Sequence, residues 1–385
     1  MTPEFQTLLA CARPRLDASQ TASIESAVRG RFDHARFLSL ATAHALAPLV
    51  YRNLKATCWD QWPPGFRTEL ESRVAANAGR SRFLTAELIR LLRVFESAGI
   101  RVVPFKGPAL AVSAYGDITL REFTDLDFLA RQGDLAPITR ILKERGYVAR
   151  EGDAYALSSG FLRNEFQFHF WRLRDSTLVE IHWRLTHRYF DFPFPLESRW
   201  EGLAETEIEG HRVLAFQPED QLLFLCVHGA RHFWSSLNWV CDVAEHIRAS
   251  PNLDWQFAFR QAALARNERT LLLGLALAQR LLGAELPAWV VSRAEGCSGF
   301  ASVIAGVIER LETLAAPGIL EMARFHMARK AGFYQKLRQC GLILTCLSIG
   351  DWEAGPAPLA LMALRRPLRL FWKYGRNVEP RMNTD

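Results

Sequence analysis

Two aspartates separated by one residue, Asp125 and Asp127, lie in a short apolar stretch of the chain. The run from Asp125 to Leu129 predicts a strand, in which alternate side chains share a face. Both carboxylates then point to one side, about 7 Å apart along the strand, and they repel each other. A divalent cation bound between them removes this repulsion, because carboxylate oxygens are ligands that Mg²⁺ prefers. The pair therefore predicts a metal site.

A third carboxylate from a neighbouring strand would complete such a site, and Glu180 is the best candidate. It lies in the middle of the β-prone run Thr177–Leu185, with apolar residues on both sides in sequence. His182 shares its face and is either a partner behind the metal ligands or a histidine satisfied by packing. A site of this kind suits nucleotides, because one ion can activate an attacking hydroxyl while a second holds the leaving pyrophosphate.

Cationic and flexible residues precede the aspartate pair. Lys106 and Gly107 follow a short apolar run that predicts a buried strand. A glycine there lets the backbone approach phosphates closely, and the start of the helix that follows favours anions. Lys106 and Arg121 could neutralise a triphosphate. Arg121 could equally form a structural salt bridge with Asp125, and the sequence leaves both interpretations open.

His228 and His232 lie four residues apart, on one face of a predicted helix. This spacing is compatible with a metal, but no glutamate completes an HExxH motif. The favoured interpretation is therefore that these histidines pack against neighbours or line the substrate site.

The elements that must position these residues fall into three predicted regions. Residues 1–98 have helical periodicity, with a break at 59–65 (WDQWPPG). Residues 99–216 contain the strand-like runs, including the hairpin of 166–173 and 177–185. Residues 217–385 are helical again, with helical stretches that include 217–247, 319–344 and 358–374. The order predicts an α/β (α+β) fold in which a small mixed sheet is flanked by N- and C-terminal helical regions.

Composition limits the class of protein. The 385 residues are 49% hydrophobic and 23% charged, with no apolar run long enough for a membrane span. The N-terminus is not built like a signal peptide, and the seven scattered cysteines indicate reduced thiols, so we expect a cytoplasmic protein. The net charge of +6 permits a polyanionic partner, but a solvated basic surface is the favoured interpretation. The basic, aromatic segment from Leu364 is expected to cover the preceding helices rather than touch a membrane.

Taken together, these motifs resemble an uncharacterised bacterial family of the polymerase-β-like nucleotidyltransferase superfamily. The resemblance rests on six stretches from about residue 77 to 375: FKG at 105–107, Tyr115-Gly116 with Arg121, DLDFL at 125–129, VEIHW at 179–183, HGARHFWSSLNWVCDV at 228–243 and RRPLRLFWKYG at 365–375. It implies a polymerase-β-like core and metal-dependent nucleotidyl transfer, with Asp125, Asp127 and Glu180 as ligands. The wider superfamily carries Gly-Ser after its first strand, where this chain has Lys106-Gly107.

The sequence therefore predicts an enzyme that moves a nucleoside monophosphate from an NTP to a hydroxyl acceptor, with Mg²⁺ or Mn²⁺ and release of pyrophosphate. Asp125, Asp127 and Glu180 are the predicted catalytic metal ligands, and Lys106, Gly107, Arg121, His182 and His228 are expected to contact the nucleotide or its metal. The acceptor stays open between protein, peptide, saccharide or another small molecule, and nucleic acid. Two alternatives are a transferase of glycosyl groups from a nucleotide-activated donor, and a non-catalytic protein that binds a nucleotide or a partner.

Overall fold

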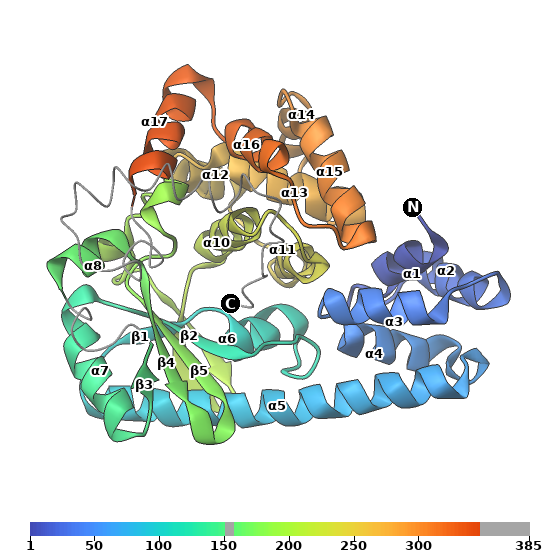
Figure 1. Cartoon of the computed structure of the whole chain (residues 1–385), viewed down its shortest axis with the longest axis horizontal. Helices are drawn as coiled ribbons and strands as arrows, with labels where there is room; N and C mark the ends of the chain where they lie inside the picture. The colour runs from blue at the N-terminus through green and yellow to red at the C-terminus, as the bar shows by residue number, and fades with distance from the viewer. Residues whose placement is uncertain (151–157, 347–385) are drawn as a thin grey trace.

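The computed structural model describes residues 1–150 and 158–346 of the chain. The N-terminal region is helical as predicted, and it ends in one long helix, α5, which starts at Pro64, within the break expected at 59–65 (Figure 1). The helices of this region are α1 (Pro3–Cys11), α2 (Ala18–Arg29), α3 (His34–Ala43), α4 (Ala47–Thr57), η1 (Trp59–Gln61) and α5 (Pro64–Ser97).

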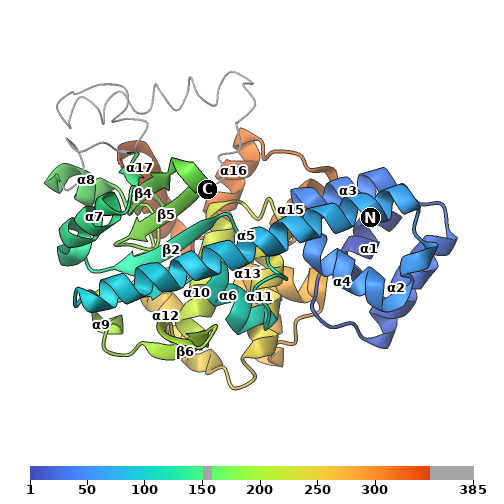
Figure 2. The same cartoon turned by 90° about the horizontal axis from the view of Figure 1, so that it is seen from below.

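Helix α5 connects two hydrophobic cores. Its first turns place Phe66 and Leu70 in the core of the N-terminal helices. Its last turns place Leu84, Leu88 and Phe95 in a second core against the central sheet. At 1.5 Å per residue the helix is about 50 Å long, and Figure 2 shows it running beneath both parts of the molecule.

The central sheet has five strands in the order β1-β2-β5-β4-β3. Strand β2 pairs in parallel with β5, and the other neighbouring pairs are antiparallel. The strands are β1 (Val102–Pro104), β2 (Asp125–Ala130), β3 (Val148–Ala149), β4 (Gln167–Arg172) and β5 (Thr177–His182). This mixed sheet with helical flanks confirms the predicted fold class.

The two faces of the sheet differ in chemistry. One face presents apolar side chains such as Leu126, Phe128 and Ile181 to α5 and to α7 (Leu135–Glu144). The opposite face carries Asp127 and Glu180, since alternate residues of a strand point to opposite sides. The central β2–β5 pair is buried along its whole length, so polar residues on the second face must be covered by other elements.

The C-terminal helices supply that cover. Helix α10 lies against the end of β1, where the Gln221 side chain donates a hydrogen bond to the carbonyl of Phe105 (3.2 Å) and the Phe224 ring lies 5.0 Å from the Phe105 ring. The helices are α10 (Pro218–Arg231), α11 (Leu237–Ala249), α12 (Trp255–Leu264), α13 (Glu268–Leu282), α14 (Ala288–Glu295), α15 (Phe300–Thr313), α16 (Ile319–Ala328) and α17 (Gly332–Thr345). Helices α10 to α16 share one hydrophobic core with the N-terminal helices.

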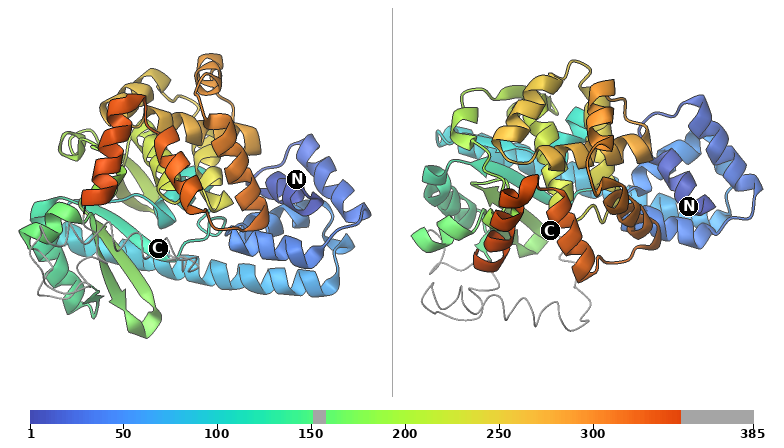
Figure 3. Two further views of the ribbon diagram at one scale, coloured as in Figure 1. Left: turned by 45° about the horizontal axis from the view of Figure 1, so that its top comes forward. Right: turned by 90° about the horizontal axis from the view of Figure 1, so that it is seen from above.

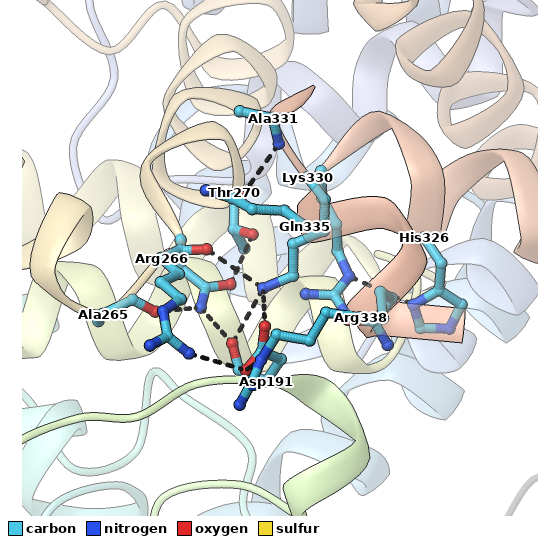
Figure 4. A network of polar contacts seen from close by, with 12 residues as sticks. Asp191, Ala265, Arg266, Thr270, His326, Lys330, Ala331, Gln335 and Arg338 are labelled. Atoms are coloured by element: carbon cyan, nitrogen blue, oxygen red, sulfur yellow. Dashed lines mark hydrogen bonds and ion pairs between the residues drawn. The ribbon is translucent and has the colours of Figure 1, made fainter. Parts of the chain in front are cut away.

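Helices α16 and α17 lie on the far side of the molecule from α5 (Figure 3). They are fastened there by Asp191, a buried residue just after η5 (Arg188–Phe190). Lys330 donates a hydrogen bond to the backbone carbonyl of Asp191 (2.9 Å), and the guanidinium of Arg338 lies 3.2 Å from its carboxylate (Figure 4). Burial lowers the pKa of Lys330 to about 7, and the charge of Arg329 beside it adds to the effect.

The structure corrects three details of the sequence-based elements. A two-stranded hairpin of β6 (Ala204–Ile208) and β7 (His211–Ala215) was not anticipated. The stretch 217–247 forms two helices, because the chain turns at Phe233 and Trp234, which both have positive φ. The stretch 319–344 is likewise divided, at residues 329–331, where Arg329 and Lys330 turn inward and are buried. The helix expected at 358–374 lies outside the described residues, and the division of the chain at residues 98 and 216 stays a prediction.

Among residues 1–150 and 158–346 we find no helix with the length and apolarity needed to cross a lipid bilayer.

Substitution of two glycines, one buried in α10 and one exposed in α5, tests how tightly α10 is packed. A Cβ at Gly229 would overlap the ring of Trp234, which is fully buried, whereas a Cβ at Gly79 in α5 would meet nothing within 4 Å. We expect Gly229→Ala to lower the free energy of unfolding by about 1–3 kcal/mol. Gly79→Ala should raise it by up to about 1 kcal/mol, because alanine favours the helix. Urea unfolding of both variants measures this, and equal shifts would contradict the packing described for α10.

Candidate active site

The parallel pairing of β2 with β5 brings the predicted carboxylates together. Asp127 lies directly opposite Glu180 in the register of the two strands, and His169 of β4 lies opposite Glu180 on its other side. A polar row therefore crosses the three central strands on the face turned away from α5. This strand pairing brings Asp127 and Glu180 side by side, although they are far apart in the sequence.

The tightest group of polar side chains on this face consists of Asp127, Glu180 and His182. One potential ligand atom from each lies within 4.8 Å of the others, and all three residues are buried. The Nε2 atom of His182 is 3.1 Å from Asp127 Oδ1 and 3.2 Å from Glu180 Oε2. His182 thus contacts both carboxylates, a position that fits a partner behind the metal ligands, one of the two roles that the sequence left open. Its ring nitrogen is also close enough to both acids to be a ligand itself.

Several atoms of this group are buried and lack a hydrogen bond from the described part of the chain. They are Asp127 Oδ2, Glu180 Oε1 and His182 Nδ1. Leaving such atoms unpaired costs free energy, so their presence together in one place indicates a missing ligand. Carboxylate and imidazole atoms at this spacing fit a divalent cation.

Asp125 begins strand β2 and is also buried, but its carboxylate is not part of this tightest group. Burial raises the pKa of Asp125 to about 7, and the neighbouring charge of Asp127 adds to the effect. Burial also favours the neutral form of Glu180, but the hydrogen bond from His182 and the charge of Lys106 outweigh it and lower the pKa of Glu180. The two carboxyl groups therefore differ strongly in acidity.

Lys106 reaches into the acidic group from the turn after β1. Its Nζ lies 2.5 Å from Asp127 Oδ1, and the residue is 9% exposed. Burial lowers the pKa of Lys106, but the carboxylates of Asp127, Asp125 and Glu180 outweigh it and raise that pKa. The ammonium group partly balances the acids that the sheet places side by side.

Gly107 makes this turn possible. Its φ is +50°, in the left-handed region, and a Cβ there would lie 3.3 Å from the backbone carbonyl oxygen of Asp125. Only glycine combines that conformation with so close a contact at low cost. The helix expected to follow is present as α6 (Gly107–Leu110) and the π-helical turn η2 (Ala111–Tyr115).

Arg121 does not pair with Asp125, so that interpretation is wrong. Its Nε and Nη2 atoms instead donate to the two carboxylate oxygens of Asp242 on α11, at 2.8 and 2.9 Å. The hydroxyl of Tyr115 donates to the same carboxylate at 2.8 Å. This buried contact ties the loop before β2 to the C-terminal helices, and it occupies the guanidinium face that a phosphate would need. A phosphate contact by Arg121 stays a prediction that this geometry does not favour.

His228 and His232 face the site from α10 as neutral rings. Burial lowers the pKa of both well below its ordinary value, and nearby cations including Lys106 and Arg231 add to the effect. Their ring centroids are 4.8 Å apart, and His232 packs on Trp239 at 4.8 Å. Among the described residues they join no metal-binding group, and this arrangement agrees with the packing or lining role expected from the sequence.

The structure thus gathers Lys106, Gly107, Asp125, Asp127, Glu180 and His182 at one place, with His228 on the covering helix. Sequence reasoning missed His169, Asp242 and Arg231. The alternation of Gln167 and His169 in a β-prone run was a usable signal for the first. The other two lie within the stretch 228–243, in which only the histidines had been considered as site residues.

Comparison with known proteins supports the resemblance seen in the sequence. Residues 30–283 match a family described as uncharacterised nucleotidyltransferase. No curated protein matches the chain. Among solved structures, the crystal structure of an antigenic nucleotidyltransferase-like protein from Paracoccidioides brasiliensis is 15% identical over 55% of this chain and 96% of that one, with a TM-score of 0.36. The family match spans well over half of the chain and includes both central strands of the sheet, and on this ground the protein belongs to the uncharacterised nucleotidyltransferase family.

Proposed function

We propose that the protein transfers a nucleoside monophosphate from an NTP to a hydroxyl acceptor, with Asp125, Asp127 and Glu180 holding Mg²⁺ or Mn²⁺. Membership of a nucleotidyltransferase family implies an NTP substrate; the metal, the ligands and the acceptor are the proposal. The observation that carries it is the buried pair of Asp127 and Glu180 on adjacent parallel strands, each with an oxygen atom that lacks a hydrogen bond from the described residues.

The bound metal would neutralise phosphate charge and favour attack by the acceptor hydroxyl. In that reaction a bond forms from the acceptor oxygen to the α-phosphorus, and the bond to the bridging oxygen of pyrophosphate breaks. The acceptor proton passes to a carboxylate of the group. His182 would keep the Asp127 and Glu180 carboxylates oriented through its hydrogen bonds to both.

Lys106 has two successive roles in this proposal. Without a metal its ammonium group stabilises Asp127, at 2.5 Å. If that carboxylate held a cation, the lysine would be free to contact the phosphates, where its positive charge would be favourable. The close approach of Gly107 to β2 keeps the lysine at the edge of the site in both states.

The first experiment incubates the protein with Mg²⁺ or Mn²⁺ and each α-labelled NTP, alone and with an extract of the source organism. We expect transfer of label with release of pyrophosphate, and a loss of about 10²-fold or more in Asp127→Asn and in Glu180→Gln. The matched control is Glu205→Gln, an exposed glutamate on strand β6, which should retain wild-type transfer.

Other products would identify the alternatives. Release of a nucleoside diphosphate from a nucleotide sugar would indicate glycosyl transfer. Metal-dependent NTP binding without turnover in any extract would indicate a binding protein. Transfer that survives in both acid variants would show that this site is not the catalytic one.

The second experiment measures the cost of the buried Asp125 carboxylate in metal-free protein. The group ionises near pH 7 in the fold but near pH 4 when unfolded, so raising the pH from 4 to 7 destabilises the wild type relative to Asp125→Asn. In EDTA we expect the variant to be more stable by up to about 4 kcal/mol above pH 7, and the difference should shrink as the pH falls toward 4.

Adding Mg²⁺ or Mn²⁺ should reverse this order, because the wild type then gains a ligand contact that Asn provides poorly. Thermal unfolding at pH 5 and pH 8, with and without metal, gives the four values needed. Asp60→Asn, at a side chain 95% exposed, is the control and should show neither effect. A stability difference between wild type and Asp125→Asn that is independent of pH would refute the proposed burial cost.

A further inference from the structure

The cations expected to bind phosphate are already engaged in the structure. Lys106 contacts Asp127, and Arg121 is held by both oxygens of Asp242. Arg231, the last residue of α10, is different, since it forms no ion pair with any residue in the described part of the chain. It is half-buried, so its charge is not fully hydrated and has no charged partner within residues 1–150 and 158–346.

The Arg231 guanidinium is nevertheless fixed in place by neutral groups. It lies over the ring of Phe166, 5.1 Å from the centroid. Its Nε and Nη2 atoms lie 3.1 and 2.9 Å from Nε2 of His232. Because a guanidinium can only donate, His232 must accept through an unprotonated Nε2, in agreement with its lowered pKa. The Nη1 atom of Arg231 has no hydrogen bond to any described residue, so its N–H groups can donate to a ligand.

This guanidinium lies close to the acidic group. The Phe166 ring that supports it is 5.8 Å from the ring of His182, which in turn bridges Asp127 and Glu180. The positive charge of Arg231 also acts on the site electrostatically, since it lowers the pKa of His228 and opposes the rise in the pKa of Lys106. Phe166 therefore connects the arginine to His182, which contacts both carboxylates.

We propose that Arg231 binds the triphosphate of the donor nucleotide, from the helical cover of the site. Planar guanidinium matches the geometry of phosphate oxygens and can bind them through two parallel hydrogen bonds. Contacts with Phe166 and His232 hold the guanidinium in position before the nucleotide binds, which reduces the entropy lost on binding. His232 is on this view a positioning residue. The inference rests on the proposed nucleotidyl transfer and adds to it a phosphate contact outside the sheet.

The test compares Arg231→Gln and Arg231→Lys with wild type in the full chain. The control is Arg80→Gln, because Arg80 also lies over a phenylalanine ring, Phe83 at 5.4 Å, and donates to neutral acceptors. Its acceptors are the backbone carbonyls of Asp175 and Ser176, at the opposite end of strand β5 from His182. Binding of ATP, GTP, CTP, UTP, inorganic triphosphate and free nucleosides is measured by calorimetry with Mg²⁺.

We expect Arg231→Gln to weaken binding of NTP and of inorganic triphosphate by about 10-fold or more, with nucleoside binding unchanged. Arg231→Lys should recover part of the loss, and the salt dependence of binding should be smaller in Arg231→Gln than in wild type. In turnover, KM for the NTP should rise more than kcat falls. Arg80→Gln should match wild type throughout.

Two negative results are distinguishable. If wild type binds NTP and this binding is lost in Asp127→Asn, while Arg231→Gln binds NTP and triphosphate as tightly as wild type, the phosphate contact is refuted. The proposed nucleotide site at Asp127 then stands, and the labelling experiment decides on transfer. The same holds if Arg231→Gln weakens nucleoside and triphosphate equally. If wild type binds no NTP with Mg²⁺ or Mn²⁺, the proposed function fails, and the inference fails with it.

Discussion

The parallel pairing of β2 with β5 is the interaction on which the rest of the site depends. It aligns Asp127 with Glu180 in the middle of a buried sheet. Two carboxylates in such a place repel each other and lose hydration, and neither cost is recovered by packing. A fold that needed stability alone would place apolar residues there, as it does on the opposite face of the same strands. The pair is therefore best explained by what it binds.

Charge balance around this pair is incomplete without a ligand. Lys106 and His182 each contact Asp127, but several buried oxygen and nitrogen atoms still lack partners among the described residues. Burial and the charge of Asp127 raise the pKa of Asp125, whereas at Glu180 the hydrogen bond from His182 and the charge of Lys106 outweigh burial and lower the pKa. A bound cation would supply the missing positive charge and satisfy several of these atoms at once.

The sequence was sufficient to predict most of the polar residues of the sheet face, although not His169, whereas among the residues of the cover it indicated only the histidines. The alternation at 125–129 and 177–183 shows which side chains share a face, and the pairing of the two strands follows from few alternatives. Residues on distant helices that contact the site show no comparable periodicity in the sequence. The contact of Arg121 with Asp242 joins residues more than a hundred positions apart. From the sequence, the only acidic partner considered for Arg121 was therefore the nearby Asp125. The break at residues 329–331 was equally hidden, because two buried cations override helical periodicity there: Lys330 contacts Asp191, and Arg329 donates to Gln339.

The helices that cover the acidic face of the sheet also contribute positive charge to the site. The sheet face contributes acids, and its own lysine is held by one of them. Arg121 is used to attach the cover through Asp242, and this attachment positions the neighbouring α10 over the acids. Arg231 at the end of α10 then brings a cation whose supports are neutral, Phe166 and His232. Neutral supports leave the charge available to an incoming anion, whereas a carboxylate partner would have to be displaced. The acids that suit a metal and the cation that suits a phosphate thus come from different parts of the chain, and the site is complete only when the helices are docked on the sheet.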